Sequence, residues 1–255
     1  MKLYAMSAGY VEHEKRVFVP SAPKGLRVQA PLPFFLIVHP KGNVLFDTGI
    51  HPDAITDAAS RWRGLDKVFA PRLRPGDDAM SQLRQLGMSV ADIDVVINSH
   101  LHFDHAGANA FFPKATVIVN RREWDAAHDA AEIKRNAFIP DDYDHPLQYT
   151  FIDGEHDLFG DGRVIVFPTY GHTPGHQSLR LEMGESGVWV LAADSCYMLE
   201  NLETCILPKV SWRAEENLAS MQRLHDLHTA KKARVVVGHD MRDWLQLPTA
   251  PLYIE

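Results

Sequence analysis

The segment from Asn98 to Gly107 concentrates side chains that bind metal ions. It reads Asn-Ser-His-Leu-His-Phe-Asp-His-Ala-Gly, so three histidines and one aspartate lie within six positions. Imidazole nitrogens and carboxylate oxygens are ligands of borderline divalent ions such as zinc. Alternate residues of an extended loop project to the same side, so His100 and His102 can chelate one ion. Asp104 and His105 can then serve a second ion, and the spacing predicts a site for two metals.

A chance cluster of histidines and a structural zinc site are the simpler interpretations of this segment. Structural zinc sites are typically closed by four ligands rich in cysteine, and the chain has only Cys196 and Cys205. These two cysteines are better explained as reduced, buried side chains than as a disulfide framework. The ligand types therefore favour a catalytic metal site.

Apolar runs that end in metal-binding side chains are the elements that must position this site. The first run, Ile93 to Ile97, predicts a buried strand before the histidine-rich loop, and the Ala/Phe-rich stretch after Gly107 predicts the start of a helix. Three later apolar runs end in the same way: 164–167 precedes His172, 188–193 precedes Asp194 and 235–237 precedes His239. Because strand ends at one edge of a sheet direct their loops to a common place, we expect these side chains to converge.

The converging side chains divide into two ligand sets. His100, His102 and His172 would form one neutral-ligand site, while Asp104, His105 and His239 would form the other. Asp194 could bridge two ions about 3.5–4 Å apart, the separation of two-metal hydrolases. His176, Asp240 and Asp47 would then support the ligands. Asp47, which ends the run Val44-Leu-Phe-Asp, could equally cap a turn.

The remaining pattern predicts alternating strands and helices along a chain of one domain, residues 1–255. The 255 residues are 45% hydrophobic, and no Pro/Gly/Ser linker or charge block divides them. Further strands are predicted at 3–8, 34–38, 44–47, 116–119 and 177–183, and helices at 80–86, 121–128 and 212–229. The polar stretch 129–145 is predicted to be irregular or helical.

Charge and hydropathy exclude some partners. The formal net charge is -7 and both signs are interspersed, so we expect no nucleic acid and no membrane partner. No apolar run approaches the roughly 18 residues of a membrane span, and the N-terminus lacks a signal-like apolar region, which predicts a cytoplasmic protein. The sequence does not determine the oligomeric state, and a homodimer stays open.

At these residues the chain resembles the metallo-β-lactamase superfamily. The shared pattern is HxHxDH, then a distant histidine, a bridging aspartate and a last histidine, on an α/β fold of four layers, the αββα sandwich. Two-metal β-lactamases usually lack the histidine at position 105, and diiron flavoproteins replace the one at 102 with an acid. Tyr197, three positions after Asp194, together with Phe103 and Gly238-His-Asp, looks like the N-acyl-homoserine lactonase branch.

The resemblance implies a metal-dependent hydrolase that opens the lactone ring of N-acyl-homoserine lactones, which are quorum signals. Two divalent ions per chain are implied, with zinc favoured and iron, cobalt or manganese also compatible with mixed histidine and carboxylate ligands. Tyr197 would stabilise the oxyanion and Asp104 would carry the proton to the ring alkoxide. Phe103, Tyr197, Met198 and Ile206 are candidates for the substrate pocket because they flank the site in sequence.

Other functions share this ligand set. Thioesterases of the glyoxalase II kind and phosphodiesterases of the RNase Z kind favour anionic substrates, and the acidic charge balance disfavours RNA more than a thioester. A protein of another class, a metal-bound sensor, would bind a lactone without turnover, but it needs neither an open coordination position nor Tyr197. Tyr197 could also be an aromatic residue packed beside a strand end.

Overall fold

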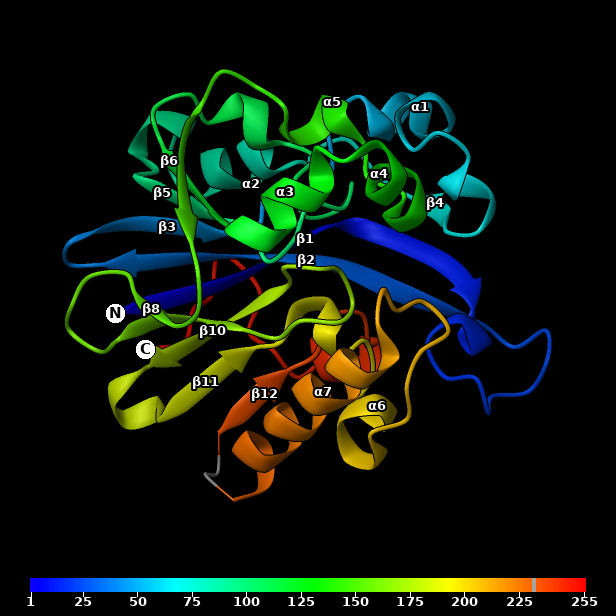
Figure 1. Ribbon diagram of the computed structural model, residues 1–255. Helices are drawn as coiled ribbons and strands as arrows, with labels where there is room; N and C mark the ends of the chain where they lie inside the picture. The colour runs from blue at the N-terminus through cyan, green and yellow to red at the C-terminus, as the bar shows by residue number, and fades with distance from the viewer. Residues whose placement is uncertain (231–232) are drawn as a thin grey trace.

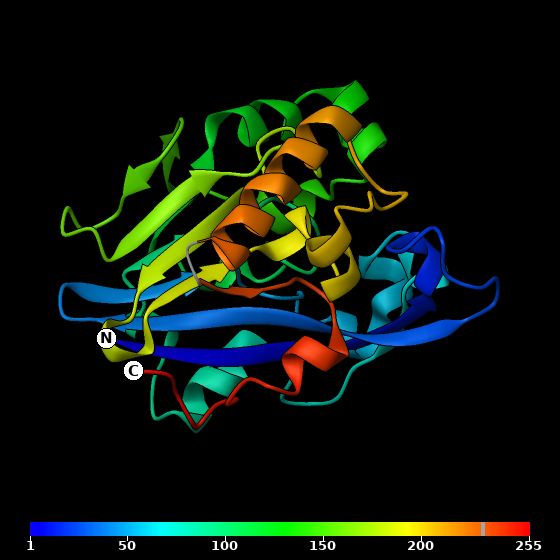
Figure 2. The same ribbon diagram turned by 90° about the horizontal axis from the view of Figure 1, so that it is seen from below.

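Two β-sheets packed face to face form the centre of the molecule, with helices on the outer face of each (Figures 1 and 2). The computed structural model describes residues 1–230 and 233–255. The expected α/β arrangement of four layers is confirmed. Within the described ranges, no helix has the length and apolar character needed to cross a membrane.

The first sheet has seven strands in the order β4-β1-β2-β3-β5-β6-β7. Its strands are β1 (Lys2–Glu14), β2 (Arg27–His39), β3 (Gly42–Phe46), β4 (Ala70–Arg72), β5 (Val95–Ile97), β6 (Thr116–Asn120) and β7 (Gln148–Ile152). β1, β2 and β3 pair antiparallel, whereas β3, β5, β6 and β7 pair parallel. The central strands are apolar on both faces because the sheet is covered on both sides.

The second sheet has five strands in the order β12-β11-β10-β9-β8. These are β8 (His156–Asp157), β9 (Val164–Pro168), β10 (Gln177–Glu182), β11 (Val188–Leu191) and β12 (Arg234–Val236). Fully buried side chains of both sheets, such as Phe46 and Leu179, share one core between the sheets. Burial of this apolar surface is what fixes the two sheets against each other.

Helices cover both outer faces (Figure 1). The first sheet carries α1 (Ala54–Arg61), α2 (Ala79–Gln85), α3 (Arg121–Ala127), α4 (Ala130–Asn136) and α5 (Pro140–Tyr143). The second sheet carries α6 (Leu199–Thr204) and α7 (Ala214–Thr229), and α8 (Met241–Trp244) follows β12. Leu224 and Leu227 of α7 pack against β9 and β11, as the apolar stripe of that helix predicts.

The structure departs from the sequence prediction after Gly107. The expected helix is only a single 3-10 turn, Asn109–Phe111. The buried side chain of Asn109 exchanges hydrogen bonds with Asn98 and accepts one from Thr48, and these bonds hold the chain in an irregular loop. A Cβ atom at Gly107 would lie 2.4 Å from the backbone nitrogen of His51, so the loop packs closely on its neighbour.

Candidate metal centre and its cavity

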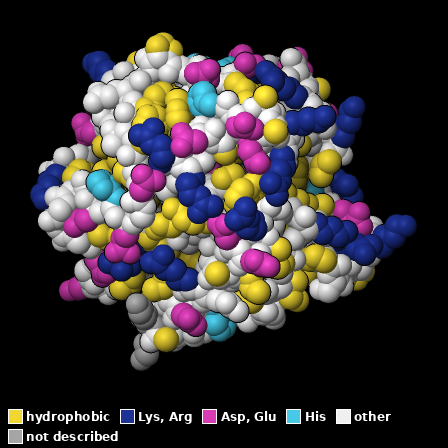
Figure 3. All heavy atoms as spheres, viewed as in Figure 1, with side chains coloured by type: hydrophobic (Ala, Val, Ile, Leu, Met, Phe, Trp, Pro, Cys, Tyr) yellow, Lys and Arg dark blue, Asp and Glu magenta, His cyan; other side chains and the backbone are white. Residues whose placement is uncertain are grey.

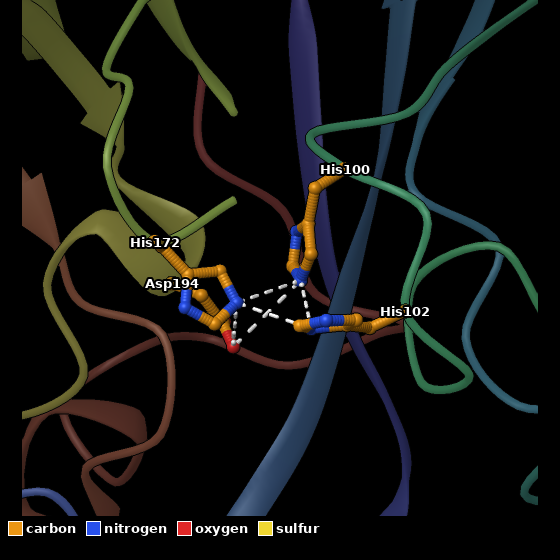
Figure 4. Close-up of side chains that lie close together, drawn as sticks. All are labelled: His100, His102, His172 and Asp194. Atoms are coloured by element: carbon orange, nitrogen blue, oxygen red, sulfur yellow. Dashed lines mark hydrogen bonds and ion pairs between the residues drawn. The ribbon is translucent and has the colours of Figure 1, made fainter. Parts of the chain in front are cut away.

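The expected ligands come together at one edge of the two sheets, although they lie far apart in the sequence. His100 and His102 follow β5, His172 follows β9, Asp194 follows β11 and His239 follows β12. Because these strands end at the same edge, their loops meet there. Figure 4 shows three of the imidazole rings and the Asp194 carboxylate directed toward one another.

The first ligand group is made of three histidine nitrogens. His100 Nε2 lies 2.9 Å from His102 Nδ1 and 3.2 Å from His172 Nε2, and the last two atoms lie 3.1 Å apart. All three rings are buried or nearly so. Burial lowers the pKa of His100 and of His172 well below the usual histidine value, so both rings are neutral and suited to ligate a cation.

The second group is richer in charge. His105 Nε2 and His239 Nε2 lie 3.6 and 3.8 Å from Asp104 Oδ2. Burial alone would lower the pKa of both histidines, but the carboxylates of Asp194 and Asp104 outweigh it and raise the pKa of His105 and of His239. A negative field that favours a proton here also favours a divalent cation.

Asp194 lies between the two groups. Its Oδ1 atom is 3.2 Å from His105 Nε2 and 3.0 Å from His239 Nε2. Its Oδ2 atom is 3.6 Å from His172 Nε2 and 3.9 Å from His100 Nε2. One oxygen thus faces each group, which is the arrangement of a carboxylate that bridges two ions.

The hydrogen bonds on the far side of the rings test whether these residues fit metal ions. His102 Nε2 lies 2.8 Å from the Asn136 carbonyl oxygen, and His239 Nδ1 lies 2.7 Å from that of Pro31. A carbonyl oxygen only accepts, so each of these outer nitrogens carries a proton, and the inner nitrogen is the one that can offer its lone pair to an ion. Among the described residues, His105 Nε2 is buried without a hydrogen bond. The residues present fit two divalent ions.

Asp47 is hydrogen-bonded to one candidate ligand and to the residue next to another. Its carboxylate accepts hydrogen bonds from His105 Nδ1 (2.8 Å), the Ser99 backbone nitrogen (2.7 Å) and Ser99 Oγ (2.8 Å). Ser99 Oγ lies 3.0 Å from His100 Nδ1 and therefore links Asp47 to the other group. Of the two roles that the sequence left open, the contacts favour the partner of a metal-binding histidine.

His176 and Asp240 have different roles from each other. His176 Nε2 accepts from the Asp194 backbone nitrogen at 3.1 Å, so this side chain orients the loop that carries Asp194. The Asp240 carboxylate accepts from the Leu199 backbone nitrogen at 3.0 Å and pairs with Arg242 at 2.7 Å. Within the described part of the chain, this carboxylate makes no hydrogen bond to a candidate ligand histidine, which differs from the expectation that Asp240 supports the ligands.

Glu123 is a buried carboxylate that the sequence did not reveal. It accepts from the backbone nitrogens of Leu101 (3.0 Å) and Gly175 (2.8 Å) and so ties together the two loops that carry His100, His102 and His172. Burial raises the pKa of Glu123 to about 7. An acidic residue early in a helix is usually solvated, and only Gly175 hints at the contact, since a Cβ there would lie 2.2 Å from the Glu123 backbone nitrogen.

A cavity of about 100 Å³ opens onto both ligand groups. Most of its apolar walls come from segments far from the ligands in sequence, namely Val11, Phe18, Leu32, Leu65, Phe69 and Val210. Phe103 and Tyr197 line it as expected. Met198 and Ile206, which were also expected there, are not among its lining residues, and Met198 is instead buried in a cluster with Phe18 and Val19.

Tyr197 is buried at the wall of the cavity, with its phenol oxygen 2.9 Å from His172 Nδ1. Burial, with the charges of Asp194 and Asp104 added, raises the pKa of Tyr197 well above its usual value, so the phenol keeps its proton. If His172 Nε2 faces a cation, its Nδ1–H donates to the phenol oxygen. The phenol proton is then free to be donated to another acceptor.

The surface around these elements carries charges of both signs. Figure 3 shows acidic and basic side chains interspersed with apolar ones on the face viewed in Figure 1. Arg135 and Lys209 lie at a second, adjoining pocket that also reaches His102 and His172. The charge distribution therefore agrees with the mixed pattern of the sequence, with a small basic area beside the metal centre.

Comparisons with known proteins agree with this geometry. A family model described as the metallo-β-lactamase superfamily matches residues 33–239. The N-acyl homoserine lactonase AttM of Azorhizobium caulinodans is 34% identical over 260 residues, covering 100% of this chain and 99% of that protein. The N-acyl homoserine lactonase AiiA of Bacillus thuringiensis subsp. kurstaki is 29% identical, with 99% and 98% covered.

A solved structure is similar over nearly the whole chain. It is an N-acyl homoserine lactone hydrolase with the product N-hexanoyl-L-homoserine bound at its catalytic metal center. The match has a TM-score of 0.89 at 29% identity and covers 99% of this chain and 98% of that one.

Proposed function

The chain belongs to the metallo-β-lactamase superfamily, and from this membership and the contacts of its metal centre we propose that it hydrolyses the lactone ring of N-acyl homoserine lactones. The product would be the open hydroxy acid, so the protein would be a hydrolase of cyclic carboxylic esters that quenches quorum signals. One observation carries the proposal: the phenol of Tyr197 and the ligands His102, His172 and His239 line a single apolar cavity.

Two divalent ions would be held by the two ligand groups. His100, His102 and His172 would bind one ion, Asp104, His105 and His239 the other, and Asp194 both. When bound, such ions lower the pKa of water to near neutrality and polarise a carbonyl oxygen. We propose zinc as the metal, since nitrogen-rich ligand groups suit it, although iron, cobalt or manganese also accept these ligand types.

The side chains around the ions would complete the reaction. Tyr197 would donate its phenol proton in a hydrogen bond to the oxyanion that forms when the lactone carbonyl is attacked. Asp104, whose carboxylate lines the cavity, would take the proton released on attack and return it to the ring oxygen as the ester bond breaks. The apolar walls, including Phe69 and Phe103, would hold the acyl chain and exclude water.

A thioesterase of the glyoxalase II kind is the second candidate. Arg135 and Lys209, at the pocket that adjoins the metal centre, could pair with the carboxylates of a glutathione thioester. The apolar walls beside Tyr197 favour an acyl lactone instead. A metal-bound sensor, which would bind a lactone without hydrolysing it, is the alternative without catalysis.

Turnover by the metal-loaded protein tests the proposal. The protein would be incubated with N-acyl homoserine lactones of several chain lengths and with a phosphodiester, and mass spectrometry would follow the product. We expect a mass gain of one water on the lactone only, and loss of this activity in His100→Ala. Tight lactone binding with no product would favour the sensor.

A further inference from the structure

Phe18 contacts the Tyr197 side chain more closely than any other described aromatic ring does. The two rings stack with centroids 3.9 Å apart and planes 8° apart. Phe18 is 3% exposed and also lies 5.7 Å from the His239 ring. It comes from the segment after β1, about 180 positions before Tyr197, so nothing in the local sequence connects the two.

We propose that Phe18 is a positioning residue that holds the Tyr197 phenol in the orientation needed for donation to the oxyanion. This inference rests on the lactonase function proposed above. By itself, the hydrogen bond with His172 Nδ1 holds only the tip of the phenol and would leave the ring able to rotate about its long axis and to swing sideways. The His239 ring limits these movements less than Phe18 does, because its centroid lies 5.7 Å from that of Tyr197 and the two planes are 25° apart. The flat face of Phe18 supplies the second anchor, because stacked rings resist both movements.

The backbone of Phe18 is itself held in place. Asn201, which is fully buried, donates from Nδ2 to the Phe18 carbonyl oxygen at 2.9 Å and accepts from the Met198 backbone nitrogen at 2.9 Å. The Lys209 backbone nitrogen donates to the Val17 carbonyl oxygen at 3.0 Å. These bonds fasten the Phe18 segment to the loop that follows Tyr197.

A chain of ion pairs also connects the Phe18 segment to the loop that follows Tyr197. Lys15, three residues before Phe18, pairs with Glu200, which also pairs with Arg242. Arg242 in turn pairs with Asp240, at 2.7 Å, next to His239. Three segments that surround the Tyr197 ring are therefore joined at their surface as well as in their interior.

Phe18 also lines the cavity, so it could act only as a wall for the acyl chain. Phe69 offers a matched comparison. It lines the same cavity, and its ring centroid lies 6.1 Å from that of Phe18. Among the described aromatic pairs, none joins Phe69 to Tyr197. A wall residue would change KM whether or not the phenol is present, whereas a positioning residue would lose its effect on kcat once the phenol is removed.

A double-mutant cycle separates the two roles. Phe18→Leu removes the flat ring but keeps most of the volume, and Phe18→Met serves if the leucine variant does not fold. We expect a loss of about tenfold in kcat with Tyr197 present and less than twofold in the Tyr197→Phe background. Phe69→Leu should have the same effect in both backgrounds. Metal content should be unchanged in every variant.

A spectroscopic measurement tests the contact without catalysis. The seven tyrosines would be replaced by 3-fluorotyrosine, and the Tyr197→Phe variant would assign the fluorine resonance of Tyr197. In the parent protein we expect a shifted, broad resonance from a ring held against Phe18. In the Phe18 variant it should narrow and move toward the resonances of mobile tyrosines.

The two measurements distinguish failure of this inference from failure of the proposed function. An unchanged fluorine resonance, or an equal loss of kcat in both backgrounds, overturns the positioning role. If the parent protein opens no lactone, the lactonase proposal fails and the fluorine resonance alone decides whether Phe18 holds Tyr197.

Discussion

Asp47→Asn should weaken the binding of one metal ion far more than the other. The carboxylate accepts from His105 Nδ1 and from two donors of Ser99, so all of its partners are donors. An asparagine can satisfy only part of this set, because its amide NH₂ would face another donor. The simplest relief is for His105 to move its proton to Nε2, which removes the lone pair that would hold the ion.

The size of the effect follows from these contacts. A buried hydrogen bond to a charged group contributes about 1.5–3 kcal/mol, which corresponds to about a 10- to 100-fold loss of metal affinity. The affinity that falls should be that for the ion held by Asp104, His105 and His239. The ion held by the three other histidines should be affected less, since Asp47 reaches His100 only through Ser99.

Competition with a chromophoric chelator measures both affinities in one titration. Asp142→Asn is the matched control, because Asp142 is also buried but pairs with Arg61 and not with a ligand. It should leave both metal affinities unchanged, whatever it does to stability. Two unchanged affinities in the Asp47 variant would refute the supporting role of that carboxylate.

Further predictions concern the phenol, a close backbone contact and pH. Tyr197→Phe should keep both metals and lower kcat on the order of 10²-fold, measured by steady-state kinetics with metal analysis; unchanged kinetics would return the residue to a packing role. Gly171→Ala should lower the free energy of unfolding by about 3 kcal/mol or more in denaturant titrations, because its Cβ would lie 2.0 Å from the Asn217 backbone nitrogen. Gly160→Ala, where φ is also positive but the space is open, should cost only about 1 kcal/mol, and equal losses would contradict the contact argument. Burial raises the pKa of Asp142 from 3.8 to about 7, so the folded state binds this proton more tightly and the contribution to stability falls as pH rises from about 4 to 7. Asp142→Asn should remove that part of the slope in the metal-free protein, and parallel stability curves for the two proteins would contradict it.

The convergence of the candidate metal ligands could be predicted from the sequence because they follow apolar runs that end at the same sheet edge. His172, Asp194 and His239 are distant in sequence, yet the strands before them determine where their loops meet. Most of the cavity walls had no such signal. Phe18 and Phe69 come from irregular segments whose contacts depend on tertiary packing. Nearness to the site in the chain, which is the only ground for expecting Met198 and Ile206, does not determine which side chains face the cavity.

Several predicted boundaries of strands and helices were wrong because they depend on tertiary packing. β1 and β2 extend over 13 residues each, well beyond the predicted runs. In β2 the residues from Ala30 to Ile37 are all buried, so the alternation of polar and apolar residues is lost, whereas β1 keeps an alternation that is shifted between Ser7 and Tyr10. The loop after Gly107 has helix-favouring residues, but hydrogen bonds among buried polar side chains determine its shape. The role of Glu123 could not be predicted, because no feature of the neighbouring sequence distinguishes a buried carboxylate from a solvated one.

The ratio of two specificity constants tests the central claim most directly. The metal-loaded protein would be assayed at constant pH against N-hexanoyl homoserine lactone, by proton release, and against a glutathione thioester of the same acyl chain, by thiol release. We predict that kcat/KM for the lactone is the higher by at least about tenfold, which is about 1.4 kcal/mol of transition-state preference. A tenfold preference for the thioester would contradict the lactonase assignment and replace it with the thioesterase.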